Sequence, residues 1–152
     1  MSQSYTYQVE SFSDVINEIK PLLHTHFDEI ATSKELKPLD PDYDRYEALE
    51  DLNMLRIMTV RFSGTLIGYF VVFLIPHIHY QQTNIAMNDI LYLAPEYRGG
   101  TVGYRLIKKS IEDLKEMNVD ILTIHMKVDY PFRELLTKLG FHKTEENWDM
   151  VL

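Results

Sequence analysis

The chain has 152 residues, of which 45% are hydrophobic and 25% charged, and this composition is typical of one globular domain, so we expect a single domain over residues 1–152. The net charge of −8 disfavours nucleic acid as a ligand, because an acidic molecule repels a phosphate backbone. The absence of cysteine excludes disulfides, thiolate metal sites and a cysteine nucleophile, and it suits a cytoplasmic protein.

Neither a secretory signal nor a membrane span is expected. The N-terminus, MSQSYTYQVE, lacks the basic start and the apolar stretch of a signal peptide. The most apolar run, Leu66–Ile75, covers half of the ~20 residues that a membrane helix needs. Its aromatic and β-branched residues favour a buried strand.

The first part of the chain predicts a strand, one or two helices and an acidic loop. Tyr5–Val9 alternates as a strand does, and Ser13 is expected to cap the helix that follows. Pro21 interrupts the apolar pattern of this helix, so the helix either kinks there or gives way to a second one. From Ser33 to Leu52 the chain is acidic and irregular, which predicts a loop with a short helix.

Three antiparallel strands are expected next. Met54–Phe62 and Leu66–Ile75 are joined by the short connection Ser63–Thr65, which is typical of a hairpin. Ile85–Leu93 supplies the third strand and ends close to a proline.

The last part of the chain alternates between helices and strands. Apolar residues recur at helical spacing over 103–117, and a second helical stripe runs from Phe132 to Leu139 and closes at Gly140. Ile121–Met126 is expected to form a strand between these helices, and Phe141–Leu152 the last strand or pair. This order predicts a mixed α/β sheet with helices on both faces.

The stretch DILYLAPEYRGGTVG, from Asp89 to Gly103, places a strand, a glycine-containing loop and a helix in direct succession. Backbone amides at a helix N-terminus lack intrahelical partners, and the helix dipole adds positive character there. Gly99 and Gly100 let a phosphate approach these amides, and Arg98 can add a charged contact. The alternative is that the glycines only permit a tight connection.

This stretch resembles the GNAT superfamily of N-acetyltransferases. The family signature is Arg or Gln, two variable residues, Gly, one variable residue, then Gly or Ala; Arg98 and Gly103 fill its outer positions. Thr101 stands where the first glycine is usual, and Gly100 beside it is expected to supply the flexibility. LLTKLGF at 135–141 is similar to the family's penultimate helix and the turn after it, and the HIHY stretch at 77–80 resembles GNAT proteins of tailed bacteriophages, which would place the protein in a host cytoplasm.

The resemblance implies the GNAT fold, a mixed and mostly antiparallel central sheet with helices on both faces, and acetyl-CoA as the acetyl donor. In this family the pantetheine arm lies between the fourth and fifth strands, which here implies hydrogen bonds to the backbones of Leu91 and Leu93. The implied pyrophosphate site comprises Arg98, Gly99, Gly100, Thr101, Val102, Gly103 and Tyr104.

The resemblance also implies catalytic roles. Asp89 matches the acidic residue that many family members use as general base, although a purely structural aspartate remains an alternative. Leu136 occupies the position of the family's usual tyrosine acid. Tyr130 is the favoured replacement, with Tyr92 and Tyr104 as alternatives, and a packed aromatic is the other interpretation of each.

The expected reaction is direct transfer of the acetyl group to a primary amine of a small molecule or a protein. The acidic segment predicts a cationic acceptor, because a negative rim concentrates cations; its residues are Asp40, Asp42, Asp44, Glu47, Glu50 and Asp51. His77 and His79 could share a face, but no cluster of further ligands accompanies them, so no metal is expected. A CoA-binding interaction protein without turnover is the alternative function, and a homodimer stays open.

Overall fold

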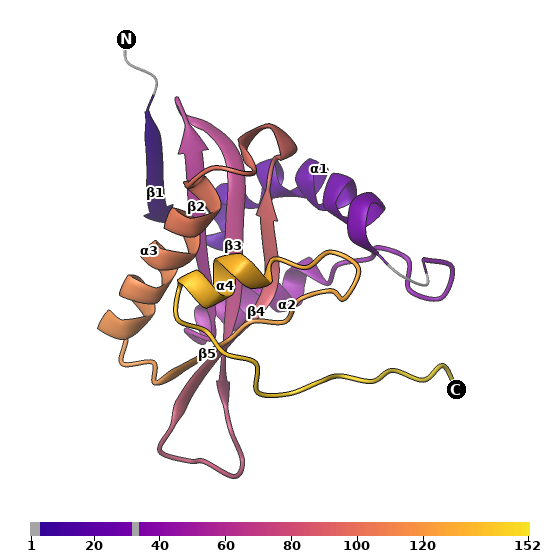
Figure 1. The fold of residues 1–152 in the computed structure, drawn as a ribbon, viewed down its shortest axis with the longest axis vertical. Helices are drawn as coiled ribbons and strands as arrows, with labels where there is room; N and C mark the ends of the chain where they lie inside the picture. Colours follow the sequence, from indigo (N-terminus) through magenta and orange to yellow (C-terminus); the bar gives the residue numbers. More distant parts are fainter. Residues whose placement is uncertain (1–3, 32–33) are drawn as a thin grey trace.

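A five-stranded sheet with the strand order β1-β2-β3-β4-β5 forms the centre of the protein (Figure 1). The structure is a computed structural model, and it describes residues 4–31 and 34–152. Strands β1 to β4 pair antiparallel, and β5 pairs parallel to β4, which confirms the predicted mixed and mostly antiparallel sheet. The strands are β1 (Tyr5–Val9), β2 (Leu55–Phe62), β3 (Thr65–Pro76), β4 (Asn84–Leu93) and β5 (Ile121–Thr123).

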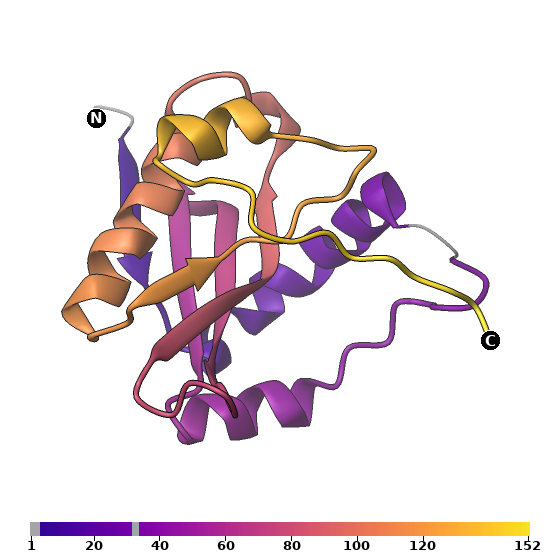
Figure 2. The ribbon, with the colours of Figure 1, turned by 60° about the horizontal axis from the view of Figure 1, so that its bottom comes forward.

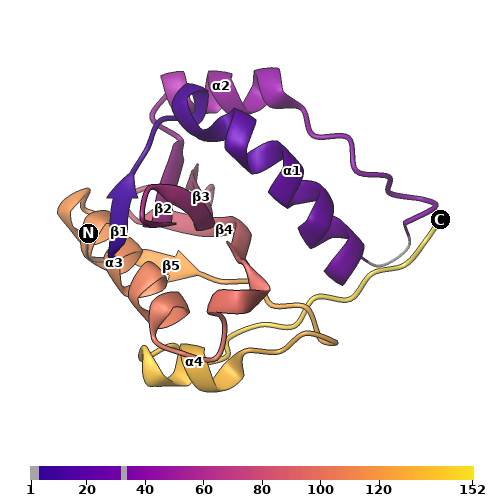
Figure 3. The same ribbon diagram turned by 90° about the horizontal axis from the view of Figure 1, so that it is seen from above.

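Helices cover both faces of this sheet, as Figure 3 shows from above. Helices α1 and α2 lie on one face, and α3 and α4 lie on the other. The helices are α1 (Phe12–Ile30), α2 (Tyr43–Asp51), the short 3₁₀ helix η1 (Pro95–Tyr97), α3 (Val102–Glu116) and α4 (Arg133–Lys138).

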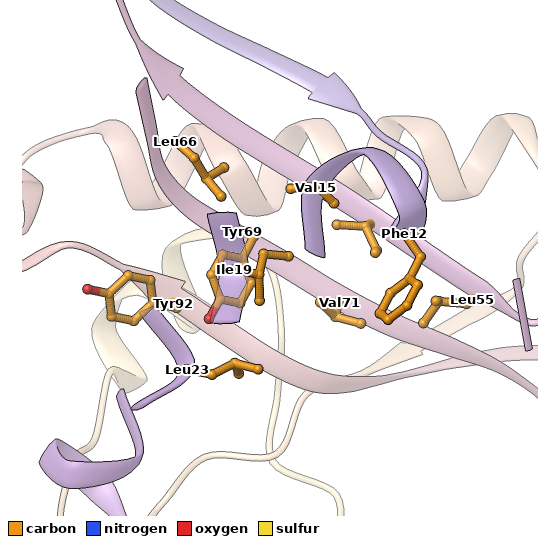
Figure 4. Close-up of a cluster of buried hydrophobic side chains, with 10 residues drawn as sticks. Phe12, Val15, Ile19, Leu23, Leu55, Leu66, Tyr69, Val71 and Tyr92 are labelled. Atoms are coloured by element: carbon orange, nitrogen blue, oxygen red, sulfur yellow. The ribbon is translucent and has the colours of Figure 1, made fainter. Parts of the chain in front are cut away.

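Each face of the sheet has its own hydrophobic core, because side chains alternate between the faces along a strand. On the α1 face, residues of α1 pack against β2, β3 and β4 (Figure 4). The apolar run predicted as a buried strand lies within β3, whose side chains enter both cores. No helix in the described residues has the length and apolar character that crossing a bilayer requires.

The first helix differs from the prediction at its N-cap, and at Pro21 it excludes one of the two alternatives, a second helix. Its N-cap is Ser11, so the prediction of Ser13 as the cap is wrong. Pro21 lies inside one helix that is continuous from Phe12 to Ile30. A proline removes one helical hydrogen bond, and burial of Ile19 and Leu23 on either side of it holds α1 together.

The acidic segment contains a short helix, as predicted. Helix α2 begins after Asp42, whose side chain accepts a hydrogen bond from the backbone N–H of Arg45 at 3.0 Å. Ser33, the predicted start of this segment, lies outside the described residues.

The C-terminal part of the sheet is smaller than predicted. Strand β5 ends at Thr123 instead of Met126, and no strand forms over the described residues 141–152, so the prediction of a last strand there is wrong. After Gly140 the chain runs across the molecule (Figure 2) and leaves Trp148 88% exposed. A segment that buries so little apolar surface gains little from ordering as a strand.

Candidate functional site

A β-bulge places Asp89 where β4 changes its pairing. Val71 pairs with Ile90 and Val72 pairs with Asn88, so Asp89 is the additional residue on β4. A bulge redirects side chains and interrupts the alternation of a strand. Before the bulge Ala86 lies in the core on the α3 face, whereas after it Ile90 packs in the core on the α1 face.

The bulge turns Asp89 toward α2, where the Tyr46 hydroxyl donates a hydrogen bond to its Oδ2 atom. Asp89 is exposed to solvent, yet desolvation by the surrounding protein raises the pKa of its carboxyl above the ordinary value. The Tyr46 hydrogen bond opposes this rise because it stabilises the carboxylate. The carboxyl of Asp89 is therefore accessible to solvent, and the protein around it still raises its pKa.

Strands β4 and β5 separate immediately before this bulge. They pair only between Ile85–Met87 and Ile121–Thr123. Beyond that point the side chain of Asn88 replaces the ladder: its Oδ1 accepts from the N–H of His125 at 2.5 Å, and its Nδ2 donates to the His125 carbonyl at 3.3 Å. The second half of β4 has no strand partner on its β5 side among the described residues.

Leu91 and Leu93 carry the open edge of β4. The N–H of Ala94 donates to the Ile67 carbonyl of β3 at 2.8 Å, and backbone groups of successive strand residues point in opposite directions. The polar groups of Leu93 and Leu91 therefore point toward β5. In agreement, the Leu93 carbonyl accepts from Arg98 Nε at 2.7 Å.

The loop between β4 and α3 presents consecutive free amides. Within the described part of the chain, the backbone N–H groups of Gly99 to Tyr104 donate to no acceptor, and Thr101 at the N-cap forms no side-chain cap. The left-handed conformation lies at Gly99, with φ of +81°, while Thr101 is right-handed with φ of −95°. Flexibility was expected at Gly100, but the structure requires glycine at Gly99, and a threonine fits at 101.

The guanidinium of Arg98 is engaged by groups other than an anion at these amides. Its guanidinium pairs with Glu29 of α1, with Nη2 at 2.9 Å from Oε2, and stacks near the ring of Tyr92. This ion pair lowers the pKa of Glu29, chiefly through the hydrogen bonds from Arg98. Arg98 thus ties the loop to α1.

Two further contacts position the loop. The ring of Tyr97 packs against that of Phe62 on β2, with centroids 5.5 Å apart. On the other side, Val102 is buried, and a Cβ added at Gly103 would lie 3.6 Å from Leu93 and 3.9 Å from Leu135 of α4. Because these are ordinary contact distances, the start of α3 has room for a methyl group and little more.

Of the other residues expected near the reaction, neither Tyr130 nor Tyr104 has a hydrogen bond to Asp89 in the described structure. Tyr130 is 47% exposed in the loop before α4, and its backbone N–H donates to the Lys127 carbonyl at 3.2 Å. Leu136 lies on α4, on the opposite face of the sheet from Tyr46. Tyr104 has Lys108 and Lys138 each 5.9 Å from its ring centroid.

His77 and His79 lie in the turn after β3 and not on a strand. Their rings are 5.5 Å apart, and the N–H of His79 donates to Nδ1 of His77 at 3.2 Å. The described residues contain no group of three or more His, Cys, Asp or Glu side chains that could hold a metal ion.

Sequence reasoning missed two residues of this site, Tyr46 and Asn88. The adjacent polar pair Asn88–Asp89 inside an apolar strand was a usable signal, since both residue types are depleted in strands and such a pair indicates an irregularity. Tyr46 had no comparable signal, because its contact with Asp89 spans 43 residues.

Comparison with models of protein families gives one match. The family model described as "Acetyltransferase (GNAT) family" matches residues 18–141. A search of curated proteins finds no match.

Solved structures share the fold at low identity. A ribosomal-protein-alanine N-acetyltransferase from Brucella melitensis biovar Abortus 2308 is 19% identical, with a TM-score of 0.72 over 98% of this chain and 99% of its own. A predicted acetyltransferase with acetyl-CoA from Clostridium acetobutylicum is 14% identical, with a TM-score of 0.72 over 97% and 96%. An aminoglycoside acetyltransferase from an uncultured soil metagenomic sample, in complex with sisomicin, is 11% identical, with a TM-score of 0.74 over 97% and 96%.

Proposed function

Because the chain belongs to the acetyltransferase (GNAT) family, we propose that it is an N-acetyltransferase that moves the acetyl group of acetyl-CoA directly to a primary amine. The observation that carries this proposal is the row of free amides from Gly99 to Tyr104 at the start of α3. They lie next to the open edge of β4. Family membership and these two features support the same ligand.

The residues of the loop fit a pyrophosphate. Backbone N–H groups at a helix N-terminus bind anions through hydrogen bonds and the helix dipole. An added Cβ at Gly99 or Gly100 would meet no atom within 4 Å, so the space beside the loop is open. In our proposal Arg98 is shared: a bound phosphate competes with Glu29 for its guanidinium.

The open edge of β4 fits the amide-containing arm of the same ligand. The backbones of Leu91 and Leu93 offer donors and acceptors that β5 does not use. Use of the Leu93 carbonyl requires Arg98 Nε to give up its bond to this oxygen. The open edge of β4 and the loop before α3 are therefore coupled through the side chain of Arg98.

Asp89 is the proposed general base. Acetyl-CoA supplies the acetyl group as a thioester, so that a C–N bond forms, the C–S bond breaks and the proton lost by the amine is available to the departing sulfur. Asp89 accepts a proton from the ammonium form of the acceptor, directly or through water, and its raised pKa makes it a better base than an ordinary aspartate. The acid role of Tyr130 stays a prediction, and thiolate departure needs little help because a thiol pKa is roughly 8 to 9.

The acceptor is proposed to be a cation, such as a polyamine-like molecule, a lysine side chain or an N-terminal amine. Two acidic residues of the segment around α2 stabilise the fold: Asp42 caps α2, and Glu50 accepts a hydrogen bond from the N–H of Phe12 at 2.7 Å. Asp40, Asp44 and Glu47 are exposed and free to act as a negative rim.

Calorimetry with CoA and acetyl-CoA tests the cofactor site. Wild type and Gly103→Ala should both bind, since a methyl group fits at this position. Gly103→Glu should lose at least about tenfold in affinity, because it adds bulk and negative charge beside the free amides. No binding by wild type at millimolar CoA would refute the proposal.

Release of free thiol, followed with a panel of amines, tests turnover separately. Transfer to at least one amine supports the enzyme. CoA binding without thiol release from any amine favours the alternative, an interaction protein of the same fold that retains the cofactor. The exposed position of Tyr130 and the leucine at position 136 are the observations that keep this alternative open.

A further inference from the structure

The orientation of Asp89 is not set by its own strand. Along a regular strand the ladder directs each side chain to one face, but at a bulge the additional residue lies outside the ladder. Asp89 is this residue, and its side chain is exposed. A carboxylate that must meet an amine in one geometry therefore needs support from another element.

Tyr46 of α2 supplies this support, and its own position is fixed by packing. Its ring stacks on that of Phe12, with centroids 5.7 Å apart and planes 4° from parallel, and contacts Phe73 of β3 at 5.9 Å. Helix α2 is in turn tied to the start of α1 by the hydrogen bond from Phe12 N–H to Glu50. The hydroxyl of Tyr46 is thus presented by a packed ring and not by a mobile side chain.

The hydrogen bond has one direction over the physiological range. Burial, and after it the contact with Asp89, raises the pKa of Tyr46 above that of a free tyrosine, so the hydroxyl keeps its proton and donates. The other titratable groups that face this pair are the hydroxyls of Tyr43 on α2 and Tyr69 on β3. In the described structure Oδ2 accepts from Tyr46 and Oδ1 accepts from no protein group.

We propose that Tyr46 is the positioning residue for the base: it holds Asp89 through Oδ2, so that Oδ1 faces the acceptor amine. This inference rests on the proposed function. It also joins the acidic segment to the reacting centre, because the helix that carries Asp44 and Glu47 carries Tyr46 as well. A movement of α2 when an acceptor binds would then change the position of the Asp89 carboxylate directly.

A double-mutant cycle tests the proposal. Tyr46→Phe keeps the packed ring and removes only the hydroxyl, so kcat should fall by about tenfold while the affinity for CoA stays unchanged. In the Asp89→Asn background the same substitution should have no further effect, because there is no base left to position. A merely structural role of Tyr46 would give additive losses, and such additivity would overturn the proposal.

Titration of Asp89 itself, by carbon NMR of the aspartate carboxyls in the apo protein, gives a readout independent of turnover. The Asp89 signal is assigned by its loss in Asp89→Asn. In Tyr46→Phe the Asp89 pKa should rise, because the hydrogen bond that stabilises the carboxylate is gone. An unchanged titration contradicts the inference even if the enzyme is active, whereas inactivity of wild type contradicts the proposed function alone.

Tyr43→Phe is the matched control. Tyr43 lies on the same helix and lines the same small apolar cavity as Tyr46, but its hydroxyl makes no hydrogen bond within the described residues. Its substitution should leave both kcat and the Asp89 titration unchanged. A loss equal to that of Tyr46→Phe would show that α2 packing, and not the Tyr46 hydroxyl, controls Asp89.

Discussion

Asp89 is subject to two opposing influences at the scale of a single residue. Desolvation raises its pKa, which strengthens it as a base, and the Tyr46 hydroxyl lowers it, which keeps the carboxylate form available. Desolvation is the larger of the two. The residue is therefore tuned toward proton acceptance without being removed from solvent.

Asp89→Asn should lower kcat by roughly 10² to 10⁴, because it removes the proton acceptor, and should leave the CoA dissociation constant nearly unchanged. Calorimetry and thiol release on one preparation measure the two quantities. Asn keeps the size of the side chain and can still accept from Tyr46, so the fold is retained. Full turnover of Asp89→Asn at every pH would show that Asp89 is not the general base. The acceptor amine would then lose its proton to solvent.

Strand β4 shows what a sequence pattern can and cannot predict about an element. Its apolar composition predicted a strand over Ile85–Leu93, and the structure has it at Asn84–Leu93. A strict two-residue period could not predict which side chains face α2, because the bulge at Asp89 reverses the faces from there on. The sequence pattern therefore predicts that β4 is a strand, whereas the bulge determines which way Asp89 points.

The prediction of a strand in the C-terminal region was wrong for a different reason. The segment after Phe141 has residues suited to a strand, but a strand forms only where a neighbouring edge and an apolar face accept it. In the structure the segment after Phe141 pairs with neither β5 nor the second half of β4, and it leaves Trp148 88% exposed, so little apolar burial favours a strand there. The contact between Tyr46 and Asp89 was likewise invisible, since tertiary hydrogen bonds leave no local pattern.

Helix α2 is the element on which the acceptor prediction depends. Asp44→Asn combined with Glu47→Gln removes two exposed charges while keeping the Asp42 cap. At low salt the KM for a polycationic amine should rise about two- to fivefold, and the rise should shrink as salt screens the rim.

Glu112→Gln combined with Glu116→Gln is the charge-matched control for this variant. Both residues are exposed on α3, on the other face of the sheet. This control should leave the KM unchanged. Equal use of neutral, anionic and cationic amines by wild type would make the segment around α2 an ordinary solvated loop.

The whole molecule divides its proposed tasks between the two faces of one sheet. The base and its support lie on the face covered by α1 and α2, and the free amides lie at the start of α3 on the other face. The pairing of β4 with β5 ends at Met87, and the Asn88 side chain bonds to His125 beyond that point. The ion pair between Arg98 and Glu29 links the loop before α3 to α1 on the other face.

The free amides of Gly99 to Tyr104 also have a consequence for isotope exchange in solution. An N–H without an acceptor gives up its hydrogen to deuterated solvent much faster than an N–H in a core strand. In the apo protein these amides should therefore label within the shortest measurable time, and saturating CoA should slow them while leaving β2 and β3 unchanged. Mass spectrometry of a peptide spanning the loop measures this deuterium uptake directly, with adenosine as the phosphate-free control ligand. Uniform slowing over the whole chain would indicate general stabilisation instead of occupancy of the loop.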